Sequence, residues 1–287
     1  MMRIFQLVCS IAVFSVFFAS CKKELSHENP NAGPPPVGND CTIATVTPCD
    51  SVSGRGYGSF HITAGADHLA QKTEWYDSTS GAVSYHANFT YSNDTIRINK
   101  KEFFLIDGYG RVKEFNTLED PLDANSEHYK YTYAYDADGQ LSSKHWFLPA
   151  YNADLPFFSY KYKWQNGNLV RLEVNESSGD KRLALTAELS YNNDQTVKDF
   201  LYFFPDAYEL ARYIFAVNMG KKPKNLLEKI VVKIYDSDGN VIQTYNTTYK
   251  NYKFSPDNYV TELYASGDVM DGLPFVDGLT KFEYQCK

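Results

Sequence analysis

Two short acidic stretches carry the residue types that could bind a divalent cation. YDADGQL and YDSDGNV each place two carboxylates beside a glycine, Gly139 in the first and Gly239 in the second. An EF-hand loop also needs a glutamate six residues after its glycine, because that carboxylate completes the oxygen shell around calcium. His145 and Tyr245 occupy those two positions. Both stretches are therefore predicted to be hairpin turns, in which the second aspartate tolerates turn geometry and the glycine is left-handed.

Other groups suited to chemistry form no recognised constellation. The chain has no G-x-S-x-G elbow, no H-E-x-x-H and no P-loop. The glycine-rich stretch from Ser53 to Phe60 lacks the spacing and the helix of a phosphate loop, so a plain loop is expected. A glycosidase needs two carboxylates across a cleft, and acids such as Glu119, Asp120 and Asp123 supply the residue type. Acidic surfaces carry many such groups, however, so these are expected to be surface residues.

The histidines give no stronger signal. They are scattered, with no pair at metal-ligand spacing, at His61, His68, His86, His128 and His145. We therefore predict a protein that is not an enzyme and that has no metal and no cofactor.

The N-terminus reads as an export signal. Arg3 supplies a positive charge, and residues 4–19 form an apolar run too short for a comfortable membrane span. The sequence Phe-Ala-Ser-Cys that ends at Cys21 resembles a bacterial lipobox, in which the cysteine after the cleavage site carries the lipid. Residues 1–20 are thus expected to be a lipoprotein signal peptide, with an ordinary secretory signal as the alternative. Acyl chains on Cys21 would hold the protein at a membrane without a spanning helix.

Residues 21–40 are expected to form a tether. This stretch is rich in proline and has no apolar periodicity, and Pro34, Pro35 and Pro36 favour an extended chain. The formal net charge of the whole chain is −7, and no basic stripe with interleaved aromatic residues occurs. Nucleic acid is therefore excluded as a partner, and binding flat on an anionic lipid surface is disfavoured.

Three cysteines remain for disulfide formation in an oxidising compartment: Cys41, Cys49 and Cys286. Three cysteines allow three pairings, and the sequence does not choose between them. A link from Cys41 or Cys49 to Cys286 would join the first strand of the folded body to the last. A zinc site is disfavoured because no two cysteines stand in a C-x-x-C.

A repeat organises residues 41–287. Gly81, Gly110, Gly139 and Gly167 follow one another at intervals of 29, 29 and 28 residues, each between two extended runs. A period near 28 residues fits one tight turn and one longer return, so the repeat predicts a meander of hairpins.

Within the repeat, aromatic residues recur at every second position. Tyr129, Tyr131, Tyr133 and Tyr135 share one face of a predicted strand, and polar residues take the other face. Ribbons with one aromatic face must assemble to hide it from water. The expected fold is all-β: a large curved antiparallel sheet, either a half-barrel or porin-like.

One short helical insertion is predicted near residues 205–223. Pro205 suits a first helical turn, apolar residues recur at helical spacing, and Gly220 and Pro223 mark the end. The apolar positions are Leu210, Tyr213, Ile214 and Val217. The helix would cover an end or open side of the sheet, or act as a lid over an apolar cavity.

The two acidic turns also carry a family resemblance. Tyr-Asp-x-Asp-Gly-x-Leu and its valine counterpart resemble the YD repeats of Rhs-type proteins, and residues 50–287 as a whole resemble the lipobox-bearing envelope proteins of the domain of unknown function 4595 family. The resemblance implies a porin-like curved sheet and no known activity. The short, degenerate repeats depart from true YD arrays, so the closed shell of the Rhs proteins is not implied.

The function predicted from the sequence is that of a lipid-anchored protein of the cell envelope, at the outer membrane and facing the periplasm or the cell surface. It would act as a non-catalytic binding protein or scaffold for a glycan or another envelope protein, with exposed Tyr57, Tyr109 and Tyr151 available to stack on sugar rings. The alternative is a carrier for lipid or another apolar ligand in a cavity capped by the predicted helix at 205–223. A hydrolase acting on glycans is a further alternative.

Overall fold

The computed structural model describes residues 41–50, 58–65, 69–77, 79–119, 125–149, 152, 154–176, 182–197, 213, 217–268 and 278–286. The predicted signal peptide, the tether and Cys21 lie outside these residues. The described chain forms a single sheet of seventeen strands, so the all-β prediction is confirmed.

The strands are β1 (Cys41–Asp50), β2 (Gly58–Ala64), β3 (Ala70–Asp77), β4 (Val83–Asn88), β5 (Thr90–Tyr91), β6 (Thr95–Arg97), β7 (Phe103–Ile106), β8 (Val112–Leu118), β9 (His128–Tyr135), β10 (Leu141–Phe147), β11 (Phe158–Gln165), β12 (Asn168–Glu176), β13 (Arg182–Thr196), β14 (Asn225–Tyr235), β15 (Val241–Phe254), β16 (Val260–Gly267) and β17 (Gly278–Cys286).

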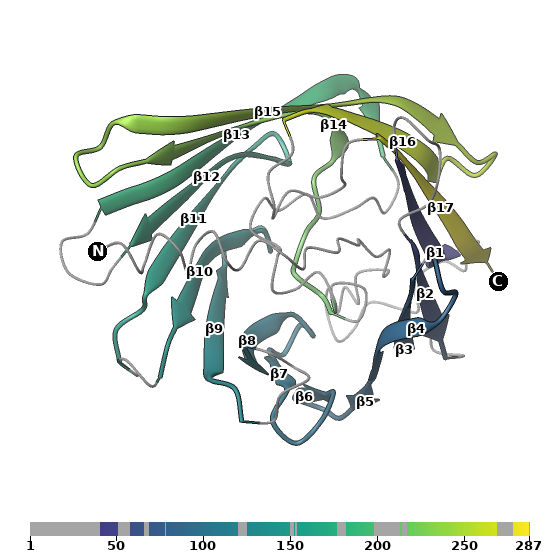
Figure 1. The fold of residues 1–287 in the computed structure, drawn as a ribbon, viewed down its shortest axis with the longest axis horizontal. Coiled ribbons are helices and arrows are strands. Elements are labelled where there is room, and N and C mark those ends of the chain that lie inside the picture. The colour runs from purple at the N-terminus through teal and green to yellow at the C-terminus, as the bar shows by residue number, and fades with distance from the viewer. Residues whose placement is uncertain are drawn as a thin grey trace.

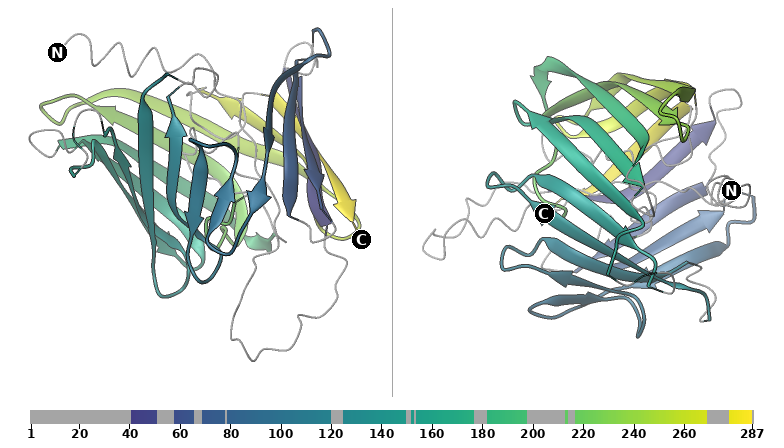
Figure 2. Two further views of the ribbon diagram at one scale, coloured as in Figure 1. Left: turned by 90° about the horizontal axis from the view of Figure 1, so that it is seen from below. Right: turned by 90° about the vertical axis from the view of Figure 1, so that its left-hand side faces the viewer.

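Consecutive strands pair antiparallel, except that β4 and β5 follow each other along the chain without pairing, and the two ends of the sheet meet. β1 pairs with β2 on one side and with β17 on the other, so the strands surround an interior in a nearly closed barrel (Figure 1). Figure 2 shows the same wall from two further sides, with the strands inclined to one another. The sequence left open whether the sheet is open or closed, and the pairing of β1 with β17 answers that question.

Side chains alternate between the two faces of the wall as the sequence pattern predicts. Tyr131 and Tyr133 are buried on the inner face of β9, whereas Ala134 is exposed. In β11, Tyr160 and Tyr162 are buried, with exposed lysines between and after them. Aromatic and aliphatic residues thus gather inside because that face alone is shielded from water.

The turn glycines lie at chain reversals. Gly110, Gly139 and Gly167 have φ values of 73°, 81° and 81°, which a residue with a Cβ adopts only under strain. Because strand direction alternates, these three turns lie at the end of the barrel where β1 begins and β17 ends. Gly81 also lies at a turn, but at the opposite end, because the short β5–β6 hairpin falls between it and Gly110.

A disulfide joins Cys41 to Cys286 at that same end, hereafter the disulfide end. Of the three pairings that the sequence allowed, this one links the first described strand to the last. Cys49 is free and buried.

The helix predicted at 205–223 is not found in the described part of that range. Tyr213 and residues 217–223 are described, and none of them is helical; the other residues of the range lie outside the described chain. Of the positions with apolar spacing, Tyr213 and Val217 are described, and both are buried at residues that are not helical, as is Met219, with exposed fractions of 1%, 1% and 0%. Residues 213 and 217–224 are called the inner segment below.

Among the described residues there is no helix long and apolar enough to cross a membrane.

Candidate functional site

The inner segment crosses the inside of the barrel and leads into β14, as the green ribbon within the ring of strands in Figure 1 shows. Near the disulfide end it runs along three successive hairpin turns. The Asn218 carbonyl accepts a hydrogen bond from the Val112 amide at 2.8 Å. Three residues later the Lys221 amide donates to the Gly139 carbonyl at 2.9 Å, and after three more the Lys224 amide donates to the Gly167 carbonyl at 3.0 Å. The regularly spaced turns therefore act as a row of backbone docking points.

Gly220 is required for this docking. Its φ is 81°, and a Cβ at this position would collide with the Gly139 carbonyl oxygen and come within 2.8 Å of the Tyr135 ring. Only glycine allows the inner segment to approach the turn so closely.

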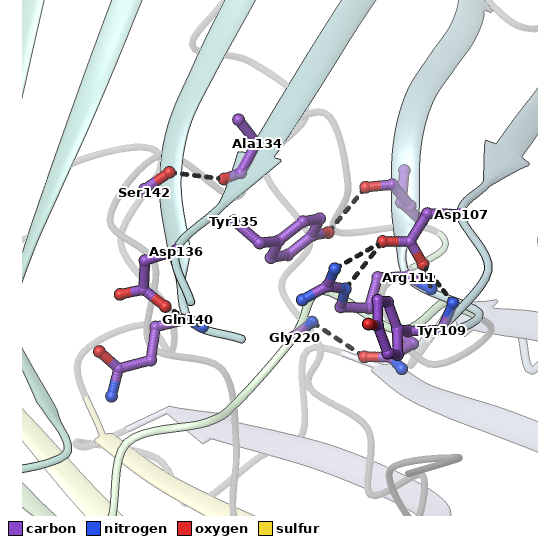
Figure 3. A network of polar contacts seen from close by, with 11 residues as sticks. Asp107, Tyr109, Arg111, Ala134, Tyr135, Asp136, Gln140, Ser142 and Gly220 are labelled. Atoms are coloured by element: carbon purple, nitrogen blue, oxygen red, sulfur yellow. Dashed lines mark hydrogen bonds and ion pairs between the residues drawn. The ribbon is translucent and has the colours of Figure 1, made fainter. Parts of the chain in front are cut away.

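A cluster of charged and aromatic residues surrounds the same turns (Figure 3). The Arg111 guanidinium forms an ion pair with Asp107 at 2.7 Å and lies against two rings, 4.7 Å from the centroid of Tyr109 and 4.4 Å from that of Tyr135. The Tyr135 hydroxyl donates to the Val112 carbonyl at 2.7 Å. Of these residues, Tyr109 is 59% exposed and presents its ring to solvent.

The first aspartate of each acidic turn is engaged by the backbone. One carboxylate oxygen of Asp136 accepts the amides of Asp138 and Gln140 at 3.0 and 2.8 Å, as Figure 3 shows in part. Asp107 and Asp236 bind the corresponding amides of their own turns. The sequence pattern drew attention to the second aspartate, but the structural role belongs to the first.

These contacts stabilise the conformation of the turns, and a carboxylate that accepts amide hydrogen bonds is favoured in its ionised form. The pKa of Asp236 is lowered, chiefly because its carboxylate accepts the Asn240 amide. The pKa of Asp77, at the β3–β4 turn, is lowered in the same way by Ser80. Within the described ranges, no group of three histidine, cysteine or acidic residues is placed to hold a metal ion.

A second polar cluster lies inside the barrel. The Tyr213 hydroxyl donates to Glu102 at 2.9 Å and is 2.7 Å from the Tyr85 hydroxyl. The Glu102 carboxylate also accepts from the Thr117 hydroxyl at 2.8 Å and from the side-chain amide of Asn99 at 2.6 Å. Glu102 is 2% exposed, so its carboxylate depends on these neutral donors. The pKa of Tyr213 is raised well above its usual value, first by burial and then by Tyr85 and Glu102.

The Tyr213 ring fills the space around this cluster. It makes edge contacts with Phe89, Phe104 and Phe115 at centroid distances of 6.3, 5.9 and 5.6 Å. From the sequence, Tyr213 was expected only as one apolar position of a helix. Its hydroxyl function was not foreseen, because Glu102 is 111 residues away in the chain.

The histidines are not brought together. His61, His86, His128 and His145 lie on four different strands, and His68 lies outside the described residues. His145 contacts the Ser159 hydroxyl at 3.1 Å, and partial burial lowers its pKa. Of the acids considered for glycoside hydrolysis, Glu119 is described, whereas Asp120 and Asp123 lie outside the described chain, as do Tyr57 and Tyr151.

The outer face of the wall is polar along the length of its strands. Exposed lysines stand in the middle of several strands, opposite to buried apolar neighbours: Lys161 and Lys163 on β11, Lys229 and Lys233 on β14, and Lys281 on β17. Ion pairs cross this face, as between Arg171 on β12 and both Glu173 and Glu188. The inner face is mainly apolar, with a few buried polar residues such as Glu102 and Lys144, and the outer face is charged.

Comparison with known proteins establishes the fold alone. No family model and no curated protein matches the sequence. The structure is similar to the crystal structure of a porin-like protein from Bacteroides uniformis, with a TM-score of 0.58 and 11% identity over 85% of this chain and 96% of that one. It is also similar to a porin-like protein from Bacteroides vulgatus, with a TM-score of 0.52 and 14% identity over 85% of this chain and 98% of that one.

These matches support an all-β, porin-like barrel resembling proteins of Bacteroides. Membership of the YD-repeat or domain of unknown function 4595 groups is not supported by any family model and stays a prediction.

Proposed function

We propose that this chain is a lipid-anchored protein of the cell envelope, with a non-catalytic role in binding or scaffolding. Lipid on Cys21 would attach it to the membrane, and residues 22–40 would hold the barrel in the water beside it. The porin-like fold fits a place at the outer membrane.

The observation that carries the proposal is the polarity of the barrel wall. A barrel that spans a membrane presents an apolar band to the lipid and a polar interior. Here lysines such as Lys161, Lys229 and Lys281 stand in the middle of the outer face, and the rings lie inside. Lysine at the bilayer midplane on such a face costs about 2–4 kcal/mol per residue. The arrangement suits a barrel that stands in water.

The packing of the inner segment favours a scaffold over a carrier of apolar molecules. A carrier needs room for its ligand beneath the predicted cap at 205–223. The described part of that range instead places Tyr213, Val217 and Met219 in the core, where the Tyr213 ring is surrounded by other rings. The barrel surface and its rim of turns are then the parts offered to a partner.

The experiment compares, in cell fractions, the full chain with a Cys21→Ser variant in which residues 1–20 are replaced by a cleavable secretory signal, so that no apolar leader remains on the variant. We expect the parent protein in the membrane fraction and the variant in the soluble fraction without detergent. A variant that stays in the membrane and needs detergent for extraction would mean that the barrel itself is inserted, and the proposal would fail.

The predicted glycan contact is tested at Tyr109, the exposed ring of the rim. We expect a glycan array to give signals that Tyr109→Ala removes and that Leu155→Ala, at another exposed apolar residue, leaves unchanged. Equal signals from the two variants would exclude Tyr109 as the sugar contact.

A further inference from the structure

The barrel wall has an incomplete ladder at one place. β4 and β5 follow each other with only Phe89 between them, and both are seen at the lower right of Figure 1. β4 pairs with β3, whereas β5 pairs with β6. Since β6 ends at Arg97, no described strand pairs with the other edge of β4 over residues 83–88.

The hydrogen-bond register shows which groups occupy this open edge. The Phe89 amide donates to the Gln71 carbonyl at 2.8 Å, and bonded and non-bonded pairs alternate along an antiparallel ladder. Counting back from Phe89, Ala87 faces β3, whereas His86 and Asn88 direct their amides and carbonyls away from β3. The edge therefore offers a row of backbone donors and acceptors.

The edge lacks the charged residues and prolines that usually prevent strand pairing, although its register with β3 shifts once, between Tyr85 and Val83, which leaves residues 85–88 as the regular part of the edge. Edge strands are commonly protected by lysine, proline or a bulge. Residues 83–88 contain no charged residue and no proline, and Val83 is 41% exposed. Tyr85 and Ala87 face the interior, while Ser84, His86 and Asn88 are exposed outside.

Behind the edge, the gap is bridged by side chains. The Tyr213 hydroxyl connects Tyr85 on β4 with Glu102, which immediately precedes β7. An added strand would thus meet an apolar inner surface with a polar centre.

We infer that the free edge of β4 is a strand-addition site for an extended segment of a partner polypeptide. The segment would alternate apolar residues, facing Tyr85 and Ala87, with polar residues facing solvent, since successive side chains of a strand take opposite faces. The inference rests on the proposed function and gives its partner a chemical class. A row of backbone groups matches a peptide rather than a glycan.

Two other occupants fit less well. The tether has Pro30, Pro34, Pro35 and Pro36, and proline cannot donate to a ladder. Two copies paired antiparallel through β4 would point their disulfide ends in opposite directions, because the two-fold axis reverses the strand. Both copies would be anchored to one membrane through residues that precede Cys41, so this arrangement is unfavourable.

Hydrogen exchange on the full lipidated chain in detergent tests the free edge without a variant. We expect the amides of His86 and Asn88 to exchange at least about a hundredfold faster than that of Ala87, which is bonded to β3. Equal protection of the three amides would overturn the inference.

Binding is measured by fluorescence anisotropy with a labelled peptide of alternating threonine and valine, seven residues long. The matched probe has proline at its central position. We expect the first peptide to bind, to protect the amides of His86 and Asn88, and to bind at least about tenfold more tightly than the proline probe. Equal binding, or binding without this protection, would contradict the site.

The variant is His86→Pro, which removes a donor that points away from β3, with His86→Ala as its control. We expect the proline variant to lose about tenfold or more in affinity and the alanine variant to bind within about twofold of the parent, because the contact is through the backbone. Loss in both variants or in neither would overturn the inference. If His86→Pro does not fold, the inference is tested by the protection of the His86 and Asn88 amides in the unaltered protein.

Sedimentation velocity separates the partner from self-association. A dimer that His86→Pro abolishes would make the occupant a second copy and overturn the partner assignment. Failure of the Cys21→Ser experiment would remove the membrane anchor but leave the exchange and peptide results unaffected, so the two proposals fail separately.

Discussion

The barrel wall is closed at two places by different means. β1 meets β17 along a ladder from Cys41 to Asp50, and a disulfide fixes its first pair. At the gap beside β4, the two sides are instead connected through the Tyr213 hydroxyl, which reaches Tyr85 and Glu102. Each of these two hydrogen bonds contributes only about 1 kcal/mol net, and the Tyr213 ring adds edge contacts with three phenylalanines. We therefore expect the closure between the chain ends to be the stronger of the two, and the wall to open first at the gap beside β4.

The largest expected effect comes from removing the disulfide. We expect the double variant Cys41→Ser with Cys286→Ser to lose about 5 kcal/mol of unfolding free energy, because the bond closes a loop of 245 residues. Chemical denaturation followed by tryptophan fluorescence measures the change.

The control for that variant is Cys49→Ala, which alters a buried cysteine outside the disulfide. A double variant no less stable than this control would show that the β1–β17 ladder closes the barrel equally well without the covalent bond. The disulfide would then not be the reason why this closure is strong.

The next effect tests the inner segment that reaches the gap. We expect Gly220→Ala to lower the unfolding free energy by about 3 kcal/mol, because the new methyl group meets the Gly139 carbonyl in a left-handed conformation. Hydrogen exchange should rise beside β4 as the segment is displaced.

Gly239→Ala is the matched control, since Gly239 has φ 82° and nothing within 4 Å of the added atom. It should cost about 1 kcal/mol from backbone strain alone. Equal losses at the two glycines would mean that the close approach at Gly220 is unimportant.

The gap itself is tested by Tyr213→Phe. We expect a loss of about 1–3 kcal/mol, because the buried Glu102 carboxylate loses one of its donors. Tyr191→Phe is the control, as the Tyr191 hydroxyl is buried without a hydrogen-bond partner in the described structure. Thermal unfolding of the two variants in parallel measures the difference in their stability. Identical melting temperatures would show that the Tyr213 hydroxyl does not stabilise the gap.

The smallest effect is that of acid on the turns. The pKa of Asp236 is lowered in the folded protein by its turn amides, so its contribution to stability is present above the ordinary value of 3.8 and is lost as the pH falls through the folded value. We expect a small decrease in melting temperature in that range. Asp236→Asn keeps an acceptor for the turn amides but does not titrate, so it should show a smaller decrease. If Asp236→Asn and the parent protein show the same acid dependence, the Asp236 carboxylate does not contribute to the stability of the wall.

The regular part of the wall could be predicted because its signals are local. A glycine between two alternating strands specifies a turn within a few residues, and the positions of Gly110, Gly139 and Gly167 at chain reversals confirm this expectation. The inner face of β9 followed in the same way from the spacing of its tyrosines.

The irregular parts depend on contacts between distant residues. Tyr213 fits a helical pattern, yet its burial is decided by Phe104, Phe115 and Glu102 on the barrel wall. The end of β6 at Arg97, which leaves one edge of β4 open, has no marker in the sequence of β4 itself. The partner of Cys286 was also undetermined, since either Cys41 or Cys49 on the same strand satisfied the sequence argument.

The adjacency of β1 and β17 has a consequence for chain connectivity. The Cα atoms of Cys41 and Cys286 are 4.0 Å apart, so a short peptide could join the two strands directly. The same barrel could then be encoded from a new starting point, for example at the exposed turn between Asp238 and Gly239. The strand at which the chain begins is therefore independent of the order in which the strands stand around the ring.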